Sequence, residues 1–473
     1  MKLRQLTELE WEIEKEPPML VPGRVFASKP LLKIIQEDES LKQLNNMAQL
    51  PGIQKYAIAL PDAHQGYGFC IGGVAALSTS EGGISPGGIG FDINCGVRVI
   101  KTKLKRKEVE PCIKELTNSL FTGVPKGIGK GSIINVPRNE LKEVLARGSN
   151  WAKDKGFATD SDLRHTEDNG YLKNNNPDFV SDRAVNRGLP EVGSLGSGNH
   201  FLEIQFVEEI YNESVSKVFG LERDDVVVMV HCGSRGLGHQ VASDYMRSIE
   251  DAYPDIVKNL PDRELAYAPG GSDLADKYFK AMNCAANFAW ANRQLITYSV
   301  RNVFEKFFDH SRGALGMELL YDVCHNIAKI ETYDGVECYV HRKGATRSFP
   351  KNHPDVPEDY KNVGQPVIIP GSMGTGCHIL VGSEGALKKS FGSTAHGAGR
   401  LMSRTKAYKE FPAVKVNQIM QDKGIYLKSE TKGTISEEAP GVYKDVDEVV
   451  RVSDQLDLAK KVCRLKPLGV IIG

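Results

Sequence analysis

The chain has 473 residues, enough for one large domain or about two to three smaller ones. Apolar residues make up 41% and charged residues 25%, which is ordinary for a soluble globular protein. Because 60 basic residues balance 60 acidic ones, a global positive field is excluded, and any nucleic-acid binding must come from a local basic patch.

Cysteine usage and the lack of long apolar runs predict where the protein resides. The 9 cysteines occur singly, without a CxxC pair, which favours a reducing compartment. The N-terminal segment is polar and soon acidic, so it does not resemble a signal peptide. No run approaches the roughly 18 apolar residues that a membrane span requires. We therefore expect a cytoplasmic protein without a membrane anchor.

Three β-branched-rich segments predict strands that meet glycine-rich loops. Residues 96–104 follow such a loop directly, residues 225–231 run into Cys232-Gly233-Ser234-Arg235-Gly236, and residues 367–370 end in a further glycine-rich loop. A helix is predicted from Ser272, a suitable N-cap, to about residue 308, because apolar residues recur there at three- and four-residue steps. Its apolar stripe breaks at Asn292-Arg293, where Asn292 either bonds within the core or supports a ligand.

Two polar stretches, residues 147–186 and 347–362, have no apolar period, and we predict long loops there. No linker rich in proline and serine divides the chain, which favours one interwoven domain.

Asp92 and Cys95 lie three residues apart in the glycine-rich turn 87–96. Glycine permits the backbone angles and close approaches that such a turn needs. A carboxylate and a thiolate together resemble half of a metal site, and a single thiolate among oxygen and nitrogen ligands suggests catalysis more than structure.

The 11 histidines divide by their surroundings. Three lie in polar segments and are expected to be solvated: His165, His310 and His353. Five others lie beside glycine, in a turn or in an apolar segment: His64, His200, His231, His325 and His396. With the Asp92–Cys95 turn they predict a joint metal or phosphate site. The residue types alone favour zinc, iron or cobalt and leave the choice at a divalent, catalytic metal.

Glycine-rich loops at residues 196–200, 233–236, 371–374 and 396–400 offer backbone N–H groups that form anion-binding nests. Arg235 and Arg400 could add charged hydrogen bonds to phosphate. Neither the P-loop nor the Rossmann fingerprint is present. A basic run, residues 101–107, and the segment 126–130 are further candidates for an RNA-backbone track, although a charge run is usually a solvated face.

The motifs PDAHQGYGFCIGGVAA, GFDINCGVR, GSLGSGNHFLEI, VHCGSRGLGH, IPGSMGTG and HGAGR resemble those of the RtcB-type RNA ligases across nearly the whole chain. The resemblance implies a single α+β domain over residues 1–473, with mixed sheets around a central metal-containing cleft. It also implies an enzyme that uses GTP and two Mn²⁺ ions to join 2′,3′-cyclic-phosphate or 3′-phosphate RNA ends to 5′-hydroxyl ends.

The resemblance further assigns roles to individual residues. Cys95 would bridge the two metal ions, and His396 would act as the nucleophile that accepts GMP from GTP. The other protein ligands to the metals would be Asp92, His200, His231 and His325. Residues matching the guanylate site are Asn199, His200, Glu203, His325, Asn326, Pro370, Gly371, Ser372, Met373, Gly397, Ala398, Gly399 and Tyr443, while Arg235 matches a position near the RNA phosphate.

Two departures from the family pattern concern the guanine contact. Ile472 stands where the family usually has a lysine that contacts guanine, and Gly376-Cys377-His378 replaces Ser-Ser-Tyr. Both put guanine specificity in question.

The expected partners are RNA, as tRNA halves or broken ends, and an archease as a possible activator, with the enzyme itself a monomer. The alternative from another class is a metal-dependent RNA phosphoesterase or cyclic phosphodiesterase that works without guanylylation. A third alternative is a non-catalytic RNA-binding scaffold.

Overall fold

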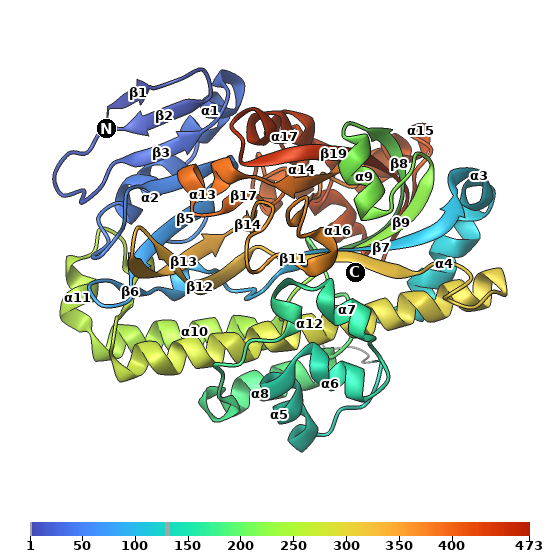
Figure 1. The fold of residues 1–473 in the computed structure, drawn as a ribbon, viewed down its shortest axis with the longest axis horizontal. Helices are drawn as coiled ribbons and strands as arrows, with labels where there is room; N and C mark the ends of the chain where they lie inside the picture. The colour runs from blue at the N-terminus through green and yellow to red at the C-terminus, as the bar shows by residue number, and fades with distance from the viewer. Residues whose placement is uncertain (1, 128–132) are drawn as a thin grey trace.

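The structure, a computed structural model, describes residues 2–127 and 133–473 (Figure 1). Two large sheets form its centre, as the predicted α+β class requires. The first sheet has the order β1-β2-β3-β4-β5-β13-β12 and is antiparallel except where β3 meets β4. Its strands are β1 (Leu3–Gln5), β2 (Glu10–Ile13), β3 (Gly23–Phe26), β4 (Ala57–His64), β5 (Ile71–Ser78), β12 (Asn326–Tyr333) and β13 (Val336–Lys343).

The second sheet has the order β11-β7-β9-β8-β19-β16-β15, with β18 parallel to β19. Its strands are β7 (Gly96–Lys105), β8 (Phe201–Ile210), β9 (Asp225–Cys232), β11 (Glu318–Cys324), β15 (Pro366–Ile369), β16 (Cys377–Gly382), β18 (Tyr426–Ser429) and β19 (Ala459–Ile472). All three predicted strands are confirmed as β7, β9 and β15. Two short ribbons complete the strands: β6 (Gly83–Ile84) with β10 (Ala268–Pro269), and β14 (Ala345–Arg347) with β17 (Ser393–Ala395).

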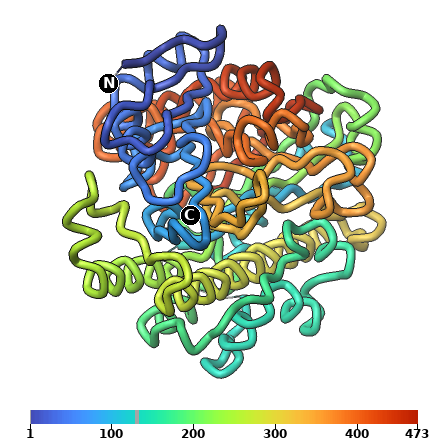
Figure 2. The backbone as a smooth tube through the Cα atoms, turned by 60° about the vertical axis from the view of Figure 1, so that its left-hand side comes forward, coloured from blue at the N-terminus to red at the C-terminus, as the bar shows by residue number. Residues whose placement is uncertain are grey.

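The longest helix, α12 (Asp273–Phe308), runs beside α10 (Arg235–Ala252) below the sheets, as Figures 1 and 2 show. Ser272 caps α12 by accepting a hydrogen bond from the Ala275 amide, so both the helix and its predicted start are confirmed. Helix α12 packs against β9 and against α4 (Ile113–Gly123), α5 (Arg138–Arg147) and α6 (Ser149–Asp154). Its residues are therefore buried on nearly every side along its middle.

The remaining helices are shorter. They are α1 (Lys29–Gln36), α2 (Ser40–Met47), α3 (Arg106–Val109), α7 (Asp160–Arg164), α8 (Asp182–Gly188), α9 (Glu213–Phe219), α11 (Pro254–Asn259), α13 (Glu384–Ser390), α14 (Arg404–Glu410), α15 (Ala413–Asp422), α16 (Lys432–Glu437) and α17 (Val446–Gln455). Among the helices that the structure describes, none has the length and apolarity needed to cross a membrane.

The loop predicted over residues 147–186 is wrong, because α6 and α7 lie within it and α8 begins in it. These helices are too short to show an apolar period, and polar side chains begin them. Thr159 accepts from the Asp162 amide at 3.1 Å, and Ser181 accepts from the Ala184 amide at 3.1 Å. The second predicted loop, 347–362, is largely irregular and holds one 3₁₀ turn, Glu358–Tyr360.

The three histidines expected in solvent have different environments. His165 is buried, with its ring nitrogens 2.9 Å from the Leu319 carbonyl oxygen and 2.8 Å from the Asp359 carboxylate. That prediction is therefore wrong, because tertiary contacts cover a locally polar segment. His310 is exposed as predicted, whereas His353 is half-buried with its ring stacked on Phe349.

The basic run 101–107 lies along β7 and into α3. At about 3.3 Å per residue, β7 carries the end of this run roughly 30 Å from the turn where the strand begins. Lys105 also pairs with Glu222 at 3.0 Å and Asp225 at 2.7 Å. The end of the basic run is therefore close to Cys95 in the sequence but far from it in space. Residues 128–130 of the second basic segment lie outside the described residues.

Candidate active site

The strand register of the second sheet brings three predicted ligands to one sheet end. His231 of β9 lies opposite Val97 of β7 and Phe201 of β8. Cys95 is two residues before Val97, and His200 immediately precedes Phe201. Side chains in or just before three different strands therefore meet because of hydrogen-bonded pairing, not because of closeness in the chain.

His325 is the single residue between β11 and β12, which belong to different sheets. Cys324, the last residue of β11, pairs with Gly96, and the His325 amide donates to the Cys95 carbonyl at 2.9 Å. The site therefore lies where the chain passes from one sheet to the other.

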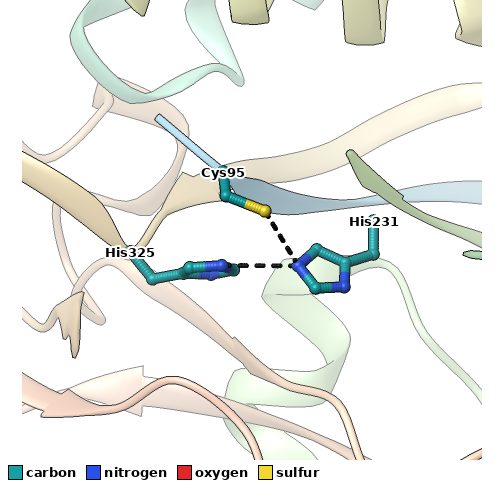
Figure 3. Close-up of side chains that lie close together, drawn as sticks. All are labelled: Cys95, His231 and His325. Atoms are coloured by element: carbon teal, nitrogen blue, oxygen red, sulfur yellow. Dashed lines mark hydrogen bonds between the residues drawn. The ribbon is translucent and has the colours of Figure 1, made fainter. Parts of the chain in front are cut away.

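Two groups of potential metal ligands share the Cys95 thiol. Its Sγ lies 3.3 Å from Nε2 of His231 and 3.5 Å from Nε2 of His200. His231 Nε2 lies in turn 3.3 Å from His325 Nε2, and Figure 3 shows these two rings and Cys95 pointing toward one another. His200 Nε2 lies 2.8 Å from Oδ2 of Asp92. The groups Cys95, His231 and His325, and Asp92, Cys95 and His200, can each hold a metal ion.

The electrostatics of these residues fit a divalent cation. Burial lowers the pKa of His231 and His325 well below the ordinary value, so both rings are neutral and offer lone pairs. Burial and the Asp92 charge raise the pKa of Cys95, so the isolated thiol keeps its proton. A bound cation would reverse this preference and stabilise the thiolate.

Asp92 is held in place by the loop 233–236, which the sequence suggested as a phosphate nest. Ser234 Oγ and the Arg235 amide each donate to Asp92 Oδ1 at 3.2 Å. A side chain at Gly233 would clash, because an added Cβ would lie 2.4 Å from the carboxylate. Burial opposes ionisation of Asp92, but the hydrogen bond from His200 and the nearby Arg235 lower its pKa. The Arg235 guanidinium lies behind His200, 3.3 Å from its Nδ1.

Arg293, at the break in the apolar stripe of α12, supports the glycine-rich turn that carries Asp92 and Cys95 (the metal turn). The fully buried Arg293 donates to the carbonyls of Asn94 at 2.7 Å and Cys232 at 2.9 Å, and it pairs with Asp322 at 2.7 Å. Asn292 accepts from the Gly193 amide at 2.7 Å. Asn292 is therefore confirmed as a hydrogen-bonded core residue, and its support for a ligand stays a prediction.

A cavity of about 290 Å³ opens beside the metal-ligand groups. His231 and His325 line it, and His396 faces them from the end of the β14–β17 ribbon, with ring centres of His325 and His396 4.9 Å apart. Most residues predicted for the guanylate site also line it: Asn199, Glu203, His325, Asn326, Pro370, Gly371, Ser372, Met373, Gly397, Ala398, Gly399 and Tyr443. His200 and Arg235 do not line it: His200 belongs to the group with Asp92 and Cys95, and Arg235 contacts His200. His64 lines the cavity but belongs to neither group.

Asp62, which sequence reasoning missed, holds His396. Its Oδ2 lies 2.5 Å from His396 Nδ1 and accepts from the His396 amide at 2.9 Å. Burial opposes ionisation of this completely buried carboxyl, but the facing His396 and Lys444 lower its pKa. The only available signal was its place two residues before His64 in the motif PDAHQGYG.

Ile472, one of the two departures from the family pattern, lines one end of the cavity, and Cys377 of the other lies next to the lining residue Glu203. Glu203, Val470 and Ile472 line it together. Glu203 accepts from Gln205 at 2.5 Å, and the Cys377 thiol lies 3.9 Å away. Burial raises the pKa of Glu203 to about 8. The carboxyl therefore keeps its proton near neutral pH in an apolar corner.

The glycine-rich loops differ in how many of their amides are available. The Ser372 amide donates to Thr375 Oγ1 at 2.8 Å, and the Ala398 amide donates to the Pro370 carbonyl at 3.1 Å. These two N–H groups are engaged within the protein, so at these positions the loops shape the cavity wall and do not offer a free donor.

These features define a mixed α/β protein with a Cys/His/Asp cluster that could hold metal ions beside a cavity. The chain belongs to the RtcB family, since the family model described as "tRNA-splicing ligase RtcB" matches residues 43–473. A protein named tRNA-splicing ligase RtcB from Thermococcus kodakarensis is 51% identical over 100% of this chain and 99% of its own length. One of the same name from Methanococcus maripaludis is 50% identical over 96% and 95%. RNA-splicing ligase RtcB homolog 1 from Entamoeba dispar is 47% identical over 92% and 82%.

Proposed function

We propose that this protein is an RNA ligase that joins 2′,3′-cyclic-phosphate or 3′-phosphate ends to 5′-hydroxyl ends, with GTP as the energy source and two Mn²⁺ ions. The observation that carries the proposal is the position of His396. Its Nδ1 is engaged by Asp62 at 2.5 Å, while its ring lies 4.9 Å from the ring of His325. A histidine so oriented beside metal ligands suits nucleophilic attack on phosphorus.

His396 would act through Nε2. A proton on Nδ1, donated to Asp62, leaves the Nε2 lone pair free, and the Asp62 carboxylate stabilises the positive charge that the ring gains on attack. The bond from Nε2 to the α-phosphorus of GTP forms as the bond to pyrophosphate breaks. The fixed ring orientation lowers the entropy cost of this step.

The metal-binding residues would divide between two ions. Asp92, Cys95 and His200 would hold one, and Cys95, His231 and His325 the other. When bound, divalent cations supply Lewis-acid stabilisation of charge on phosphate oxygens. Ser234 would keep Asp92 oriented toward the first ion, and Arg235 would do the same for His200. Arg293 would keep the metal turn rigid.

The remaining lining residues would bind guanylate. Asn199, Asn326 and Ser372 offer uncharged polar groups, and Glu203 faces the apolar end where a base would lie. In the later steps water would attack the cyclic phosphate, and the bond from phosphorus to the 2′ oxygen would break, which gives a 3′-phosphate and a 2′-hydroxyl. GMP then moves from His396 to that phosphate, and the 5′-hydroxyl displaces GMP. Both transfers of GMP, to His396 and from it, would use this histidine and the metal-ligand groups beside one cavity.

The names of the relatives support tRNA halves as a substrate, with other broken RNA ends as a second source. An archease would act as an activating partner, the enzyme would work as a monomer, and the cytoplasm would be its location.

The test is covalent labelling with α-labelled GTP and Mn²⁺, followed by ligation of RNA strands that carry the two end types. We expect acid-labile label on the parent and on His310→Ala, which removes an exposed histidine that does not line the cavity. His396→Ala should lose both label and ligation. ATP in parallel tests the effect of Ile472. Release of phosphate or opening of cyclic phosphate without label would instead support a metal-dependent phosphoesterase.

A further inference from the structure

Three aromatic rings form a row beside the active-site cavity. The rings of Phe91 and His239 are stacked with their centres 4.9 Å apart and an interplanar angle of 26°. Tyr67 meets Phe91 edge-on at 6.2 Å. The three residues come from the loop after β4, the metal turn and the first turns of α10, so the row is assembled by the tertiary structure.

The two outer rings of this row lie outside the hydrophobic core, and Phe91 between them packs against its edge. Tyr67 is 63% exposed, one of the largest exposures of any aromatic side chain in the described residues, and His239 is also exposed. Phe91 between them is half-buried. Exposed aromatic rings that contact one another next to a cavity are typical of a binding surface.

The row separates two hollows. Tyr67 and Phe91 line the active-site cavity, and both also line a second cavity of about 270 Å³. Phe91 immediately precedes the metal ligand Asp92, so their Cα atoms are about 3.8 Å apart. A nucleotide bound at the row would therefore neighbour the reacting phosphate.

Cations lie near the row. Arg187 is exposed, donates to Gln240 on α10 at 3.0 Å, and acts electrostatically on His239. Arg263 lines the second cavity, where it pairs with Glu250 at 2.8 Å. Guanidinium groups beside aromatic faces are the combination that binds single-stranded nucleic acid, because one contacts phosphate while the other stacks on bases.

We infer that Tyr67 and His239, supported by Phe91, stack on an unpaired base of the RNA strand next to the end that is joined. The inference rests on the proposed function and names how the same site selects its substrate. Since every base has a flat face, the row accepts any sequence but requires an unpaired nucleotide. A flush duplex end would bind less well than an overhang.

The experiment uses short RNA strands with the fluorescent base 2-aminopurine at or beside the end, one set ending in 3′-phosphate and one in 5′-hydroxyl. Stacking quenches this base, so titration with the protein measures affinity and stacking together. Tyr67→Ala and His239→Ala should each weaken binding of one strand type roughly 5- to 150-fold and remove the quench, as the loss of about 1–3 kcal/mol of stacking predicts. Tyr67→Phe should keep both, because it keeps the ring.

Tyr211→Ala is the matched control. Tyr211 is also an exposed tyrosine stacked on a histidine, His378, but it follows the far end of β8 from the cavity. This variant should bind RNA like the parent. The strand type that loses affinity identifies which RNA end the row holds.

A strand with an abasic site at the affected position separates stacking from a folding defect. The parent should lose affinity for it, while Tyr67→Ala should bind it as it binds the intact strand. Unchanged affinity and quench in both alanine variants, or equal binding of abasic and intact strands by the parent, would overturn the inference. Covalent labelling by GTP needs no RNA, so its failure in the parent would refute the proposed function separately.

Discussion

Nδ1 of His396 lies 2.5 Å from Oδ2 of Asp62, although the two residues are 334 positions apart in the chain. The carboxylate is completely buried, and it also accepts the His396 amide. Asp62 thus fixes the ring orientation, and a carboxylate at this position favours the tautomer that carries its proton on Nδ1.

Asp62→Asn should lower the rate of His396 guanylylation by roughly 100-fold or more, because an amide no longer favours the tautomer with a free Nε2. Single-turnover labelling measures this rate. Asp447→Asn provides the control, since Asp447 lies 2.6 Å from Nε2 of His378 in a similar pair outside the cavity. Equal labelling by Asp62→Asn and the parent would contradict the role of Asp62.

Cys95→Ala should impair binding at both metal positions, whereas His325→Ala should impair only one, because the thiol alone belongs to both groups. Loss of a direct ligand should cost at least about 10- to 100-fold in affinity. Titration with Mn²⁺ under calorimetry measures stoichiometry and affinity. Cys232→Ala, which removes the buried thiol next to His231, should retain both ions. Loss of one ion only from Cys95→Ala would argue against a shared thiolate.

Arg293→Met should destabilise the fold by roughly 3–5 kcal/mol, since it leaves the carbonyls of Asn94 and Cys232 without their donor and weakens the pairing of buried Asp322. Metal affinity should fall as well, because Asn94 lies in the metal turn. Urea denaturation and metal titration check the two effects. Arg301 lies on the same helix, α12, and forms a comparable buried pair with Asp162 of α7. Arg301→Met should therefore lower stability but leave metal affinity unchanged.

Stability should depend on pH through Glu203. Burial raises its pKa from 4.5 to about 8, so the folded state retains a proton that the unfolded chain has already lost. Its contribution is therefore fully present below about pH 4.5 and is lost as pH rises through about 8, by at most about 1.4 kcal/mol per pH unit.

Glu203→Gln should flatten the unfolding free energy over this window, as denaturation from about pH 5 to 8.5 would show. Glu209→Gln, an exposed position on the same strand, should keep the slope of the parent. If the Glu203→Gln variant also keeps the parent slope, Glu203 is excluded as its source.

Local patterns in the sequence determined much of this protein. The step pattern and the Ser272 cap predicted α12, and β-branched runs predicted β7, β9 and β15. Such signals lie within a few residues of one another, so they can be recognised without knowledge of the fold. The motifs likewise indicated the family and the residues from which the metal cluster is built.

The tertiary structure alone decided which of these residues meet. Strand register joined Cys95, His200 and His231, and the passage between sheets added His325. Short helices formed in a segment without an apolar period, because tertiary packing stabilises helices too short to persist alone. Helix α6 packs against α12, α7 against β11 and α8 against α10. Asp62 contacts His396 only because β4 and β17, from distant segments of the chain, lie against each other. Pairing register and long-range packing depend on the whole chain, so no local pattern could have revealed that contact.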